Sequence, residues 1–351
     1  MQRELAKAHR LSDRPARAQN IAKRIKDAYT GFHAGRRAGL KAGRPRFKEY
    51  GQYKSITYPQ TGFRVEGDGL YLSKIGDIWI RLHRELLETV KTLTVKRMPS
   101  GRWYACFSCV VEKQPREKPF RDVGVDVGLN SYAVLSDGAR VENPGYYRKE
   151  ERSLAWLQRK FSRKRKGSRN REKARIKVAR LHERIENRRY DFLHKASRQI
   201  ANTYETVYVE NLKITNMVRN RCLAKYISDA SWGRFTRMIA YKAEGAGGQV
   251  IRVDLRNTSQ LCSQCGEMVE KTLSQRIHVC PCCGLVMDRD LNGALNVLMR
   301  GREIGRGPPE YTPVGELAAT QPLGGGQARA LALSFAYVNL RLTYGSNLVK
   351  L

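Results

Sequence analysis

The chain has 351 residues, enough for two modest domains, and its 66 lysines and arginines against 33 aspartates and glutamates give a formal net charge of +33. Self-repulsion of that size is tolerated when the partner is a polyanion, so the composition favours nucleic acid over a membrane surface. No stretch of 18 apolar residues is present, and the first residues lack the apolar core of a signal peptide. We therefore expect a cytoplasmic, nucleoid-associated protein that does not contact a membrane.

The first part of the chain predicts a helix and then short strands. Apolar residues recur at helical spacing over residues 14–36, and glycines end the pattern soon afterwards. Turn signals at 67–69 and 99–101 divide residues 53–113 into strands.

The last of these strands, within RWYACFSCVVEK (102–113), is apolar on both faces, which is typical of a small closed β-barrel. Cys106 and Cys109 have the spacing of a metal motif. On a strand, however, two residues three apart point to opposite faces. We therefore interpret both as core cysteines.

A polar linker at 114–122 precedes VGVDVGLNSYAVLSDG, which predicts two strands joined by a tight turn. Residues 147–205 are expected to be helical, with a break at 167–168. Residues 159–189 carry 15 lysines and arginines and only three acids, so phosphate contact is favoured over a merely solvated face. The candidate nucleic-acid-binding residues are Arg159, Lys160, Arg163, Lys164, Arg165, Lys166, Arg169 and Arg171.

The later elements are expected as a strand at 206–210, a helix at 231–244, a strand at 249–253 and a helix at 291–300. Beyond residue 301 the chain is rich in glycine and proline to about residue 326, which predicts disorder. Residues 327–351 are more apolar and receive no assignment.

Two cysteine pairs have the spacing of zinc knuckles. Cys262 and Cys265 lie in LCSQCG, and Cys280 and Cys283 lie in VCPCCG. Four thiolates complete a tetrahedral Zn²⁺ site with no open position, so the predicted ion is structural. Cys282 is expected to point away, and we interpret the nearby histidine of the IHV segment as a strand residue.

Three acids lie where a catalytic metal site could form. Asp126 stands inside an apolar strand, Glu210 ends another, and Asp290 directly precedes a helix. Each has an ordinary alternative: Asp126 could accept backbone N–H groups, and Asp290 could cap its helix.

Three carboxylates on separate elements can converge only if a cation offsets their repulsion. Two Mg²⁺ ions about 4 Å apart are a known solution for phosphodiester hydrolysis. One ion activates a water and the other stabilises the leaving oxygen. The three acids together therefore favour a nuclease.

In this order the motifs resemble the RuvC nuclease domain of TnpB (OrfB) proteins, transposon-encoded relatives of type V CRISPR effectors. The resemblance rests on VGVDVGLNSYAVLSDG, YVENL, TSQLCSQCG, CPCCG and DRDLNGALN. ISDASWGRF with YKAEGAG is similar to that family's helix between its second and third RuvC motifs. PRFKEY and the strands to residue 113 resemble its wedge domain. The similarity covers roughly residues 15 to 300.

The resemblance implies an α/β RNase H-like (RuvC) core with an inserted zinc ribbon, preceded by a small β-barrel and a partial helical segment. It places recognition helices at 1–45, the wedge at 46–118, the nuclease at 119–256 and 288–300, the ribbon at 257–287 and a disordered tail at 301–351. It also implies catalytic, magnesium-binding roles for Asp126, Glu210 and Asp290, since Asp290 and not Asp288 fits the family position.

The family acts with a guide RNA that reads the target by base pairing, while the protein reads a short flanking motif. Structural zinc, two magnesium ions, guide RNA and double-stranded target DNA are thus the expected cofactors and partners of a monomer. Family members usually have a longer N-terminal part, so the resemblance implies a shortened N-terminus.

Three functions remain open from the sequence. The first is an RNA-guided, Mg²⁺-dependent DNA endonuclease of a transposable element. The second is a guide-RNA-dependent DNA-binding protein that cleaves inefficiently or only represses. The third is a strand-joining transposase, which would need a recombinase constellation that we do not find in the sequence.

Overall fold

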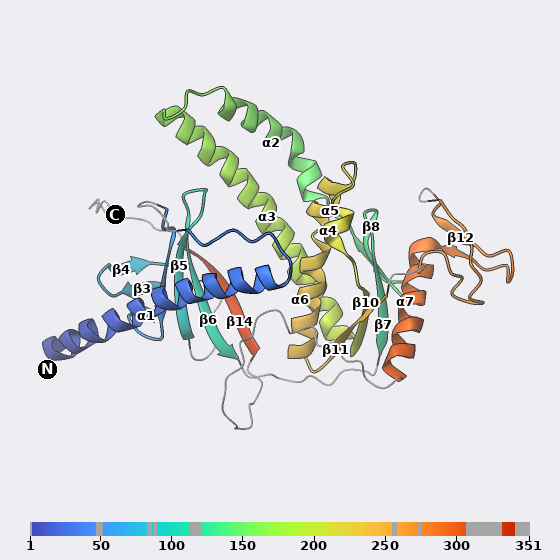
Figure 1. The fold of residues 1–351 in the computed structure, drawn as a ribbon, viewed down its shortest axis with the longest axis horizontal. Helices are drawn as coiled ribbons and strands as arrows, with labels where there is room; N and C mark the ends of the chain where they lie inside the picture. The colour runs from blue at the N-terminus through green and yellow to red at the C-terminus, as the bar shows by residue number, and fades with distance from the viewer. Residues whose placement is uncertain are drawn as a thin grey trace. The chain divides into compact units, whose positions relative to one another are not determined.

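The computed structural model divides the chain into two compact units, which we describe separately (Figure 1). The described residues are 2–46, 52–82, 86, 90–111, 121–254, 258–272, 275–306 and 332–340. Unit 1 comprises Met1–Glu112, Lys166–Arg180 and Arg329–Leu351, and unit 2 comprises Lys113–Arg165 and Leu181–Ala328.

Unit 1 contains two antiparallel sheets. The larger sheet has the strand order β1 (Ser55–Pro59), β5 (Val90–Arg97), β6 (Trp103–Val111) and β14 (Ala332–Leu340). The smaller one has the order β2 (Phe63–Glu66), β3 (Gly69–Leu72) and β4 (Gly76–Trp79).

The two sheets of unit 1 share one core, to which both contribute alternate side chains. Leu70 and Leu72 of β3 are fully buried with Ala105 and Phe107 of β6. The pairing among the described strands gives two separate sheets, and the closed barrel expected from β6 stays a prediction. On β6, Ala105, Phe107 and Cys109 are buried in this core, whereas Tyr104 and Cys106 are half-buried.

Two features of unit 1 differ from expectation. Helix α1 (Gln2–Arg37) begins well before residue 14, and its apolar residues Ile21 and Ile25 are exposed. Residues 332–340 are not disordered, because they form β14 and pair with β6 over its whole length. An unpaired strand edge is a template for such pairing, and the partner can come from any distance along the chain.

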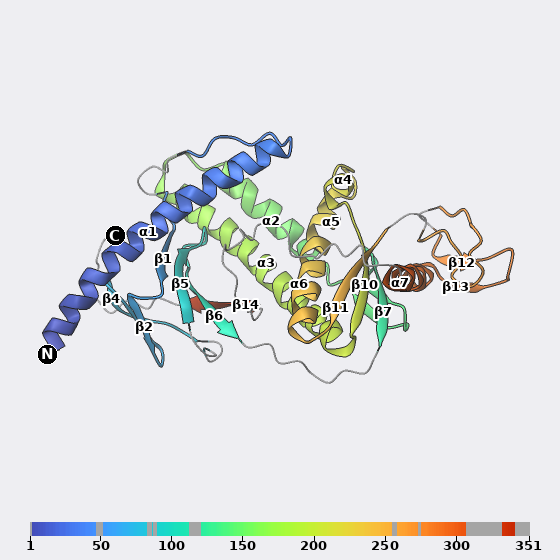
Figure 2. The ribbon, with the colours of Figure 1, turned by 60° about the horizontal axis from the view of Figure 1, so that its bottom comes forward.

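Unit 2 is built on one five-stranded mixed sheet (Figure 2). Strands β7 (Asp122–Val127), β8 (Ser131–Leu135) and β9 (Arg140–Glu142) form an antiparallel meander. Strand β10 (Thr206–Glu210) then pairs in parallel with both β7 and β11 (Gln249–Val253). The order across the sheet is β11-β10-β7-β8-β9.

Helices cover both faces of this sheet. Val207 and Val209 of β10 face the core that holds Leu193 and Phe235, whereas Tyr208 between them packs with Val297. The first face is covered by helices that include α3 (Arg169–Thr203) and α6 (Trp232–Gly245), and the second by α7 (Arg289–Arg306). The remaining helices are α2 (Tyr146–Ser162), α4 (Ile214–Met217) and α5 (Ala224–Ala230).

Helix α7 lies unusually close to the sheet. A Cβ on Gly124 of β7 would fall 2.1 Å from the carbonyl oxygen of Ala294, and one on Gly301 would fall 1.9 Å from the Tyr208 ring. Glycine at both positions permits this approach. The helix also continues to Arg306, beyond the end that we expected at residue 300.

Strands β12 (Ile277–Val279) and β13 (Val286–Asp288) form a short antiparallel hairpin immediately before α7. The hairpin carries the second cysteine pair at its turn. None of the helices in the described ranges combines the length and apolar character that crossing a bilayer requires.

Candidate metal centre and nuclease site

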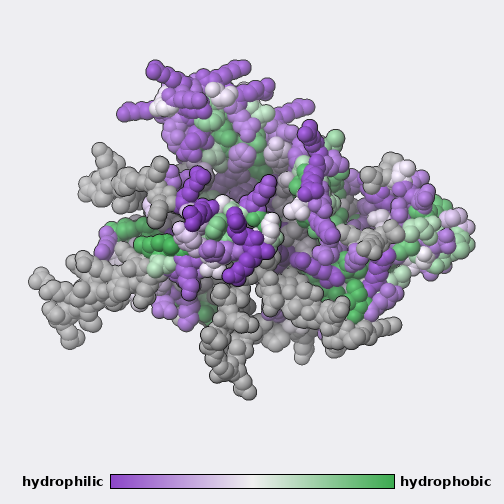
Figure 3. Space-filling view, viewed as in Figure 1, coloured by the Kyte–Doolittle hydropathy of each residue, from purple (hydrophilic) through white to green (hydrophobic). Residues whose placement is uncertain are grey.

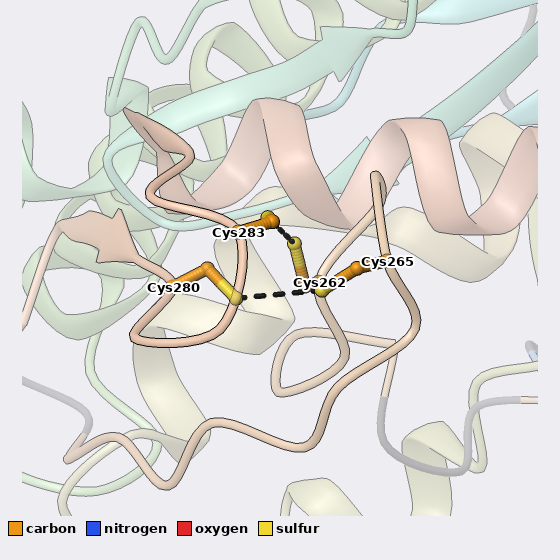
Figure 4. Close-up of side chains that lie close together, drawn as sticks. All are labelled: Cys262, Cys265, Cys280 and Cys283. Carbon is orange, nitrogen blue, oxygen red and sulfur yellow. Dashed lines mark hydrogen bonds between the residues drawn. The ribbon is translucent and has the colours of Figure 1, made fainter.

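The four predicted zinc ligands come together in unit 2 (Figure 4). The Sγ atoms of Cys262, Cys265, Cys280 and Cys283 all lie within 4.8 Å of one another. Cys262 Sγ is 3.6 Å from Cys283 Sγ, and Cys265 Sγ is 3.5 Å from Cys280 Sγ. Four thiolates about 2.3 Å from a tetrahedral Zn²⁺ ion lie about 3.8 Å apart, so the four cysteines fit zinc.

The two knuckles have the same backbone geometry. Gly266 and Gly284 have φ angles of 76° and 73°, and their N–H groups donate to the carbonyl oxygens of Cys262 and Cys280. The left-handed conformation favours glycine. Hydrogen bonds from main-chain N–H groups, that of Cys283 first, lower the pKa of Cys280 to about 7, so Cys280 is the thiol of this group that most readily gives a thiolate. Burial and hydrogen bonds with the other thiols raise the pKa of Cys265.

The other cysteines and the histidine of this region lie outside the metal group. Cys282 is exposed, and His278 is buried on β12. Cys106 and Cys109 lie on β6 in unit 1, where Cys109 is buried in the core and Cys106 is half-buried. Burial raises the pKa of both of these thiols.

Asp126 and Glu210 stand side by side at one edge of the sheet. Val209 pairs with Val125 in the parallel register of β10 and β7, so the next residue on each strand is one of the two acids. Asp126 lies on the face covered by α7, where a Cβ on Gly293 would fall 2.9 Å from Asp126 Oδ2. The strand pairing thus delivers two carboxylates to one place.

Asp290 approaches the same edge from the first turn of α7. A Cβ on Gly128, just after β7, would lie 4.0 Å from Asp290 Oδ2. Asp290 does not cap its helix, because Asp288 Oδ1 accepts the N–H groups of Asp290 at 2.9 Å and Leu291 at 3.1 Å. The Asp290 carboxylate is thereby left for other partners.

Two arginines pair with Asp290. Arg289 Nη2 lies 3.3 Å from Asp290 Oδ1, and Arg276 Nη1 lies 3.9 Å from Asp290 Oδ2. The side chain of Arg276 is 47% exposed, so it is accessible to an anion at this edge. No sequence pattern singled out Arg276, because it is one of many arginines.

The charges of Glu210 and Asp290 act on the carboxyl group of Asp126. Burial raises the pKa of Asp126 well above its usual range, and the charges of Glu210 and Asp290 raise it further, while Arg289 opposes them. Burial also raises the pKa of Glu210, against a hydrogen bond from Thr258. Among the described residues, the four Sγ atoms are the one group of three or more possible metal ligands that lie close together, within 4.8 Å of one another. The oxygen atoms of the three acids are spread more widely than these sulfur atoms.

Carboxylate oxygens that repel one another in a buried place are stabilised by a hard divalent cation. The donor set here consists of three acids on β7, β10 and α7, next to a partly exposed arginine. The residues present therefore fit Mg²⁺.

The predicted nucleic-acid-binding residues follow one another at the end of α2, through the turn after it and at the start of α3. Arg171 is half-buried and the other seven are exposed. Hydrophilic residues dominate the visible surface of the two helices (Figure 3). Lys160 Nζ stacks 3.6 Å from the ring centroid of Trp156, which is itself 51% exposed.

Comparison with known proteins identifies the family of the chain. The family model OrfB_IS605, described as "Probable transposase", matches residues 106–221, and the model "Cas12f1-like, TNB domain" matches residues 232–297. A Streptomyces pristinaespiralis protein named "Putative RNA-guided DNA endonuclease" is 37% identical over 304 residues, which are 85% of this chain and 74% of that protein. The chain belongs to the TnpB (OrfB) family.

Other TnpB relatives extend the comparison. InsQ of Escherichia coli K12, named "Putative RNA-guided DNA endonuclease InsQ", is 34% identical and covers 84% of this chain and 76% of its own. The cryo-EM structure of a Cas12f1-sgRNA-target DNA complex matches with a TM-score of 0.50 at 18% identity, over 75% of this chain and 67% of that one. This likeness concerns the fold of this TnpB-family chain.

Proposed function

We propose that this TnpB-family protein is an RNA-guided, Mg²⁺-dependent DNA endonuclease of a transposable element. The observation that carries the proposal is the approach of Asp126, Glu210 and Asp290 to one edge of the sheet from three separate elements. Relatives named as RNA-guided DNA endonucleases support the choice of activity.

The sheet topology supports an RNase H-like (RuvC) core. An antiparallel meander of three strands, followed by two strands parallel to the first, is the arrangement that this assignment requires. The acids lie at or next to the carboxyl ends of β7 and β10, where open α/β sheets place their ligands.

In this proposal the three acids hold two Mg²⁺ ions, which would supply an activated water and charge stabilisation for the leaving 3′ oxygen. Other residues of the chain shape the proposed Mg²⁺ site. Gly293 leaves room for the Asp126 carboxylate, Asp288 caps α7 so that Asp290 need not, and Arg276 is accessible to the phosphate of the cleaved strand.

Guide RNA and double-stranded target DNA are the proposed partners of a monomer. The net charge of +33 and the exposed cations of α2 and α3 support polyanion binding along these helices. The zinc centre, which has four thiol ligands, is assigned a structural role.

Sequencing the RNA that co-purifies with the protein, followed by plasmid cleavage programmed by that RNA, tests the proposal. We expect one discrete RNA species and cleavage of plasmids that match its guide segment. Specific RNA binding with target binding but without cleavage would favour the alternative of a guide-dependent DNA-binding protein. Absence of any specific RNA would contradict guided action altogether.

A further inference from the structure

A chain of buried and partly buried hydrogen bonds connects the first zinc knuckle with Glu210. Thr258 lies four residues before Cys262 and is 3% exposed. Its hydroxyl donates to Glu210 Oε1 over 2.9 Å. The bond engages one carboxylate oxygen, and a carboxylate has a second oxygen with which it can bind a cation.

Thr258 is held in place by helix α7. Asn296 Nδ2 donates to the carbonyl oxygen of Thr258 at 2.8 Å and to that of Leu261 at 2.8 Å. Asn292, one turn earlier, donates to the same Leu261 oxygen at 2.7 Å and accepts the N–H of Ser263 at 2.9 Å. Both asparagine side chains are buried.

Leu261 and Ser263 flank the zinc ligand Cys262, which is fully buried. Helix α7, which carries Asp290, is therefore hydrogen-bonded to the first knuckle. The segment that leads into this knuckle also places the Thr258 hydroxyl against Glu210. Buried polar groups are costly unless paired, so this network specifies one arrangement of the knuckle, α7 and Glu210.

We propose that Thr258 is a positioning residue for Glu210, through which the zinc ribbon sets the geometry of the Mg²⁺ site. The inference rests on the proposed function of Glu210. Partners that orient a ligating carboxylate typically change metal affinity by roughly 10- to 100-fold when they are removed. Thr258 is not one of the four cysteine ligands of the tetrahedral site, and its hydroxyl donates to Glu210.

The test compares Thr258→Val, which keeps the shape and removes the hydroxyl, with Thr258→Ser, which keeps the hydroxyl. Thr203→Val is the matched control, because the Thr203 hydroxyl donates to the Gln199 carbonyl at 2.9 Å on exposed α3. Zinc content, melting temperature and Mg²⁺ affinity by calorimetry are measured on the full-length, RNA-free proteins. The Mg²⁺ concentration for half-maximal cleavage is measured on the guide complexes.

We expect Thr258→Val to retain zinc and melting temperature while its Mg²⁺ affinity falls roughly 10-fold or more. Thr258→Ser and Thr203→Val should behave like the wild type. Equal Mg²⁺ affinity of Thr258→Val and wild type would overturn the inference, as would a serine variant that is as defective as the valine variant.

The two proposals fail separately. A wild-type complex that never cleaves DNA would contradict the proposed function, yet the calorimetric comparison would still decide the role of Thr258. If Thr258→Val loses zinc, the valine disturbs folding, and Thr258→Ala takes its place in the comparison. Equal Mg²⁺ affinity of Thr258→Ala and Thr258→Ser would then overturn the inference.

Discussion

The carboxylate of Asp288 accepts a hydrogen bond from the main-chain N–H of Asp290 at 2.9 Å. The earlier acid thus caps helix α7, while the later one points its carboxylate toward the sheet edge that carries Asp126. Two acids of one DRD motif therefore have different tasks, and mutation can separate them.

Replacing Asp288 by alanine should lower the free energy of unfolding by about 1 kcal/mol, the usual cost of a lost N-cap. Asp288→Asn should restore stability, because asparagine caps as well as aspartate does. Both variants should cut DNA at temperatures where they are folded. Denaturant unfolding and cleavage assays on the same preparations check both expectations. Loss of cleavage in a stable Asp288→Asn protein would show that Asp288, and not only Asp290, takes part in catalysis.

The zinc centre predicts a contrast between neighbouring cysteines. Cys283→Ser should release zinc and destabilise unit 2, because one of four tetrahedral ligands is lost. Cys282→Ser should keep both zinc and stability, since Cys282 is exposed and outside the metal group. Elemental analysis together with thermal melting measures both effects. Full zinc occupancy in the Cys283→Ser protein would disprove the assignment.

Burial and two neighbouring acids raise the pKa of Asp126, so the folded state binds its proton more tightly than the unfolded state does. Without metal, stability should therefore fall as pH rises from the ordinary carboxyl range through the raised pKa. Asp126→Asn removes this penalty and should stabilise the metal-free protein near neutral pH.

Added Mg²⁺ should raise the melting temperature of the wild type but not that of Asp126→Asn. The exposed Asp68→Asn serves as a control and should respond like the wild type. Differential scanning calorimetry across pH, with and without Mg²⁺, supplies the measurement. A metal-free Asp126→Asn protein that is less stable than the wild type would indicate that Asp126 has a structural role.

The cations between α2 and α3 predict a salt effect. Replacing Arg163, Lys164, Arg165 and Lys166 by alanine should weaken binding to all sequences. It should also reduce the slope of log affinity against log salt by roughly 0.7 to 0.9 for each lost phosphate contact. Exchanging lysine for arginine and arginine for lysine at the same positions keeps the charge and should leave the slope nearly intact. An unchanged slope in the alanine variant would show that these four side chains are merely solvated and do not contact phosphates.

Much of the candidate site could be predicted from local sequence. Apolar strands ending near Asp126 and Glu210, and four cysteines in two knuckles, are short-range patterns whose chemistry is specific. The contacts that hold these parts together lack such a pattern. Asn292 and Asn296 are buried polar residues one turn apart on α7, and nothing in the sequence alone predicted their role.

The larger differences concern pairing across long distances. Strand β14 pairs with β6 although more than two hundred residues separate them, and the glycine-rich segment between α7 and β14 predicts disorder rather than a return to the sheet. The turns expected at 67–69 and 99–101 do separate β2 from β3 and β5 from β6, but which edges the strands share depends on tertiary packing. Local propensity gives elements more reliably than their partners.

In the proposed function Asp126, Glu210 and Asp290 act together as the magnesium site of a DNA nuclease. The most direct test is a plasmid-cleavage assay with the co-purified RNA, with Mg²⁺ or EDTA. It compares the wild type with Asp126→Asn, Glu210→Gln and Asp290→Asn. We predict cleavage by the wild type with Mg²⁺ only, and a loss of at least about 100-fold in each variant with RNA and DNA binding retained. Cleavage in EDTA, or a variant that cuts at the wild-type rate, would contradict the account.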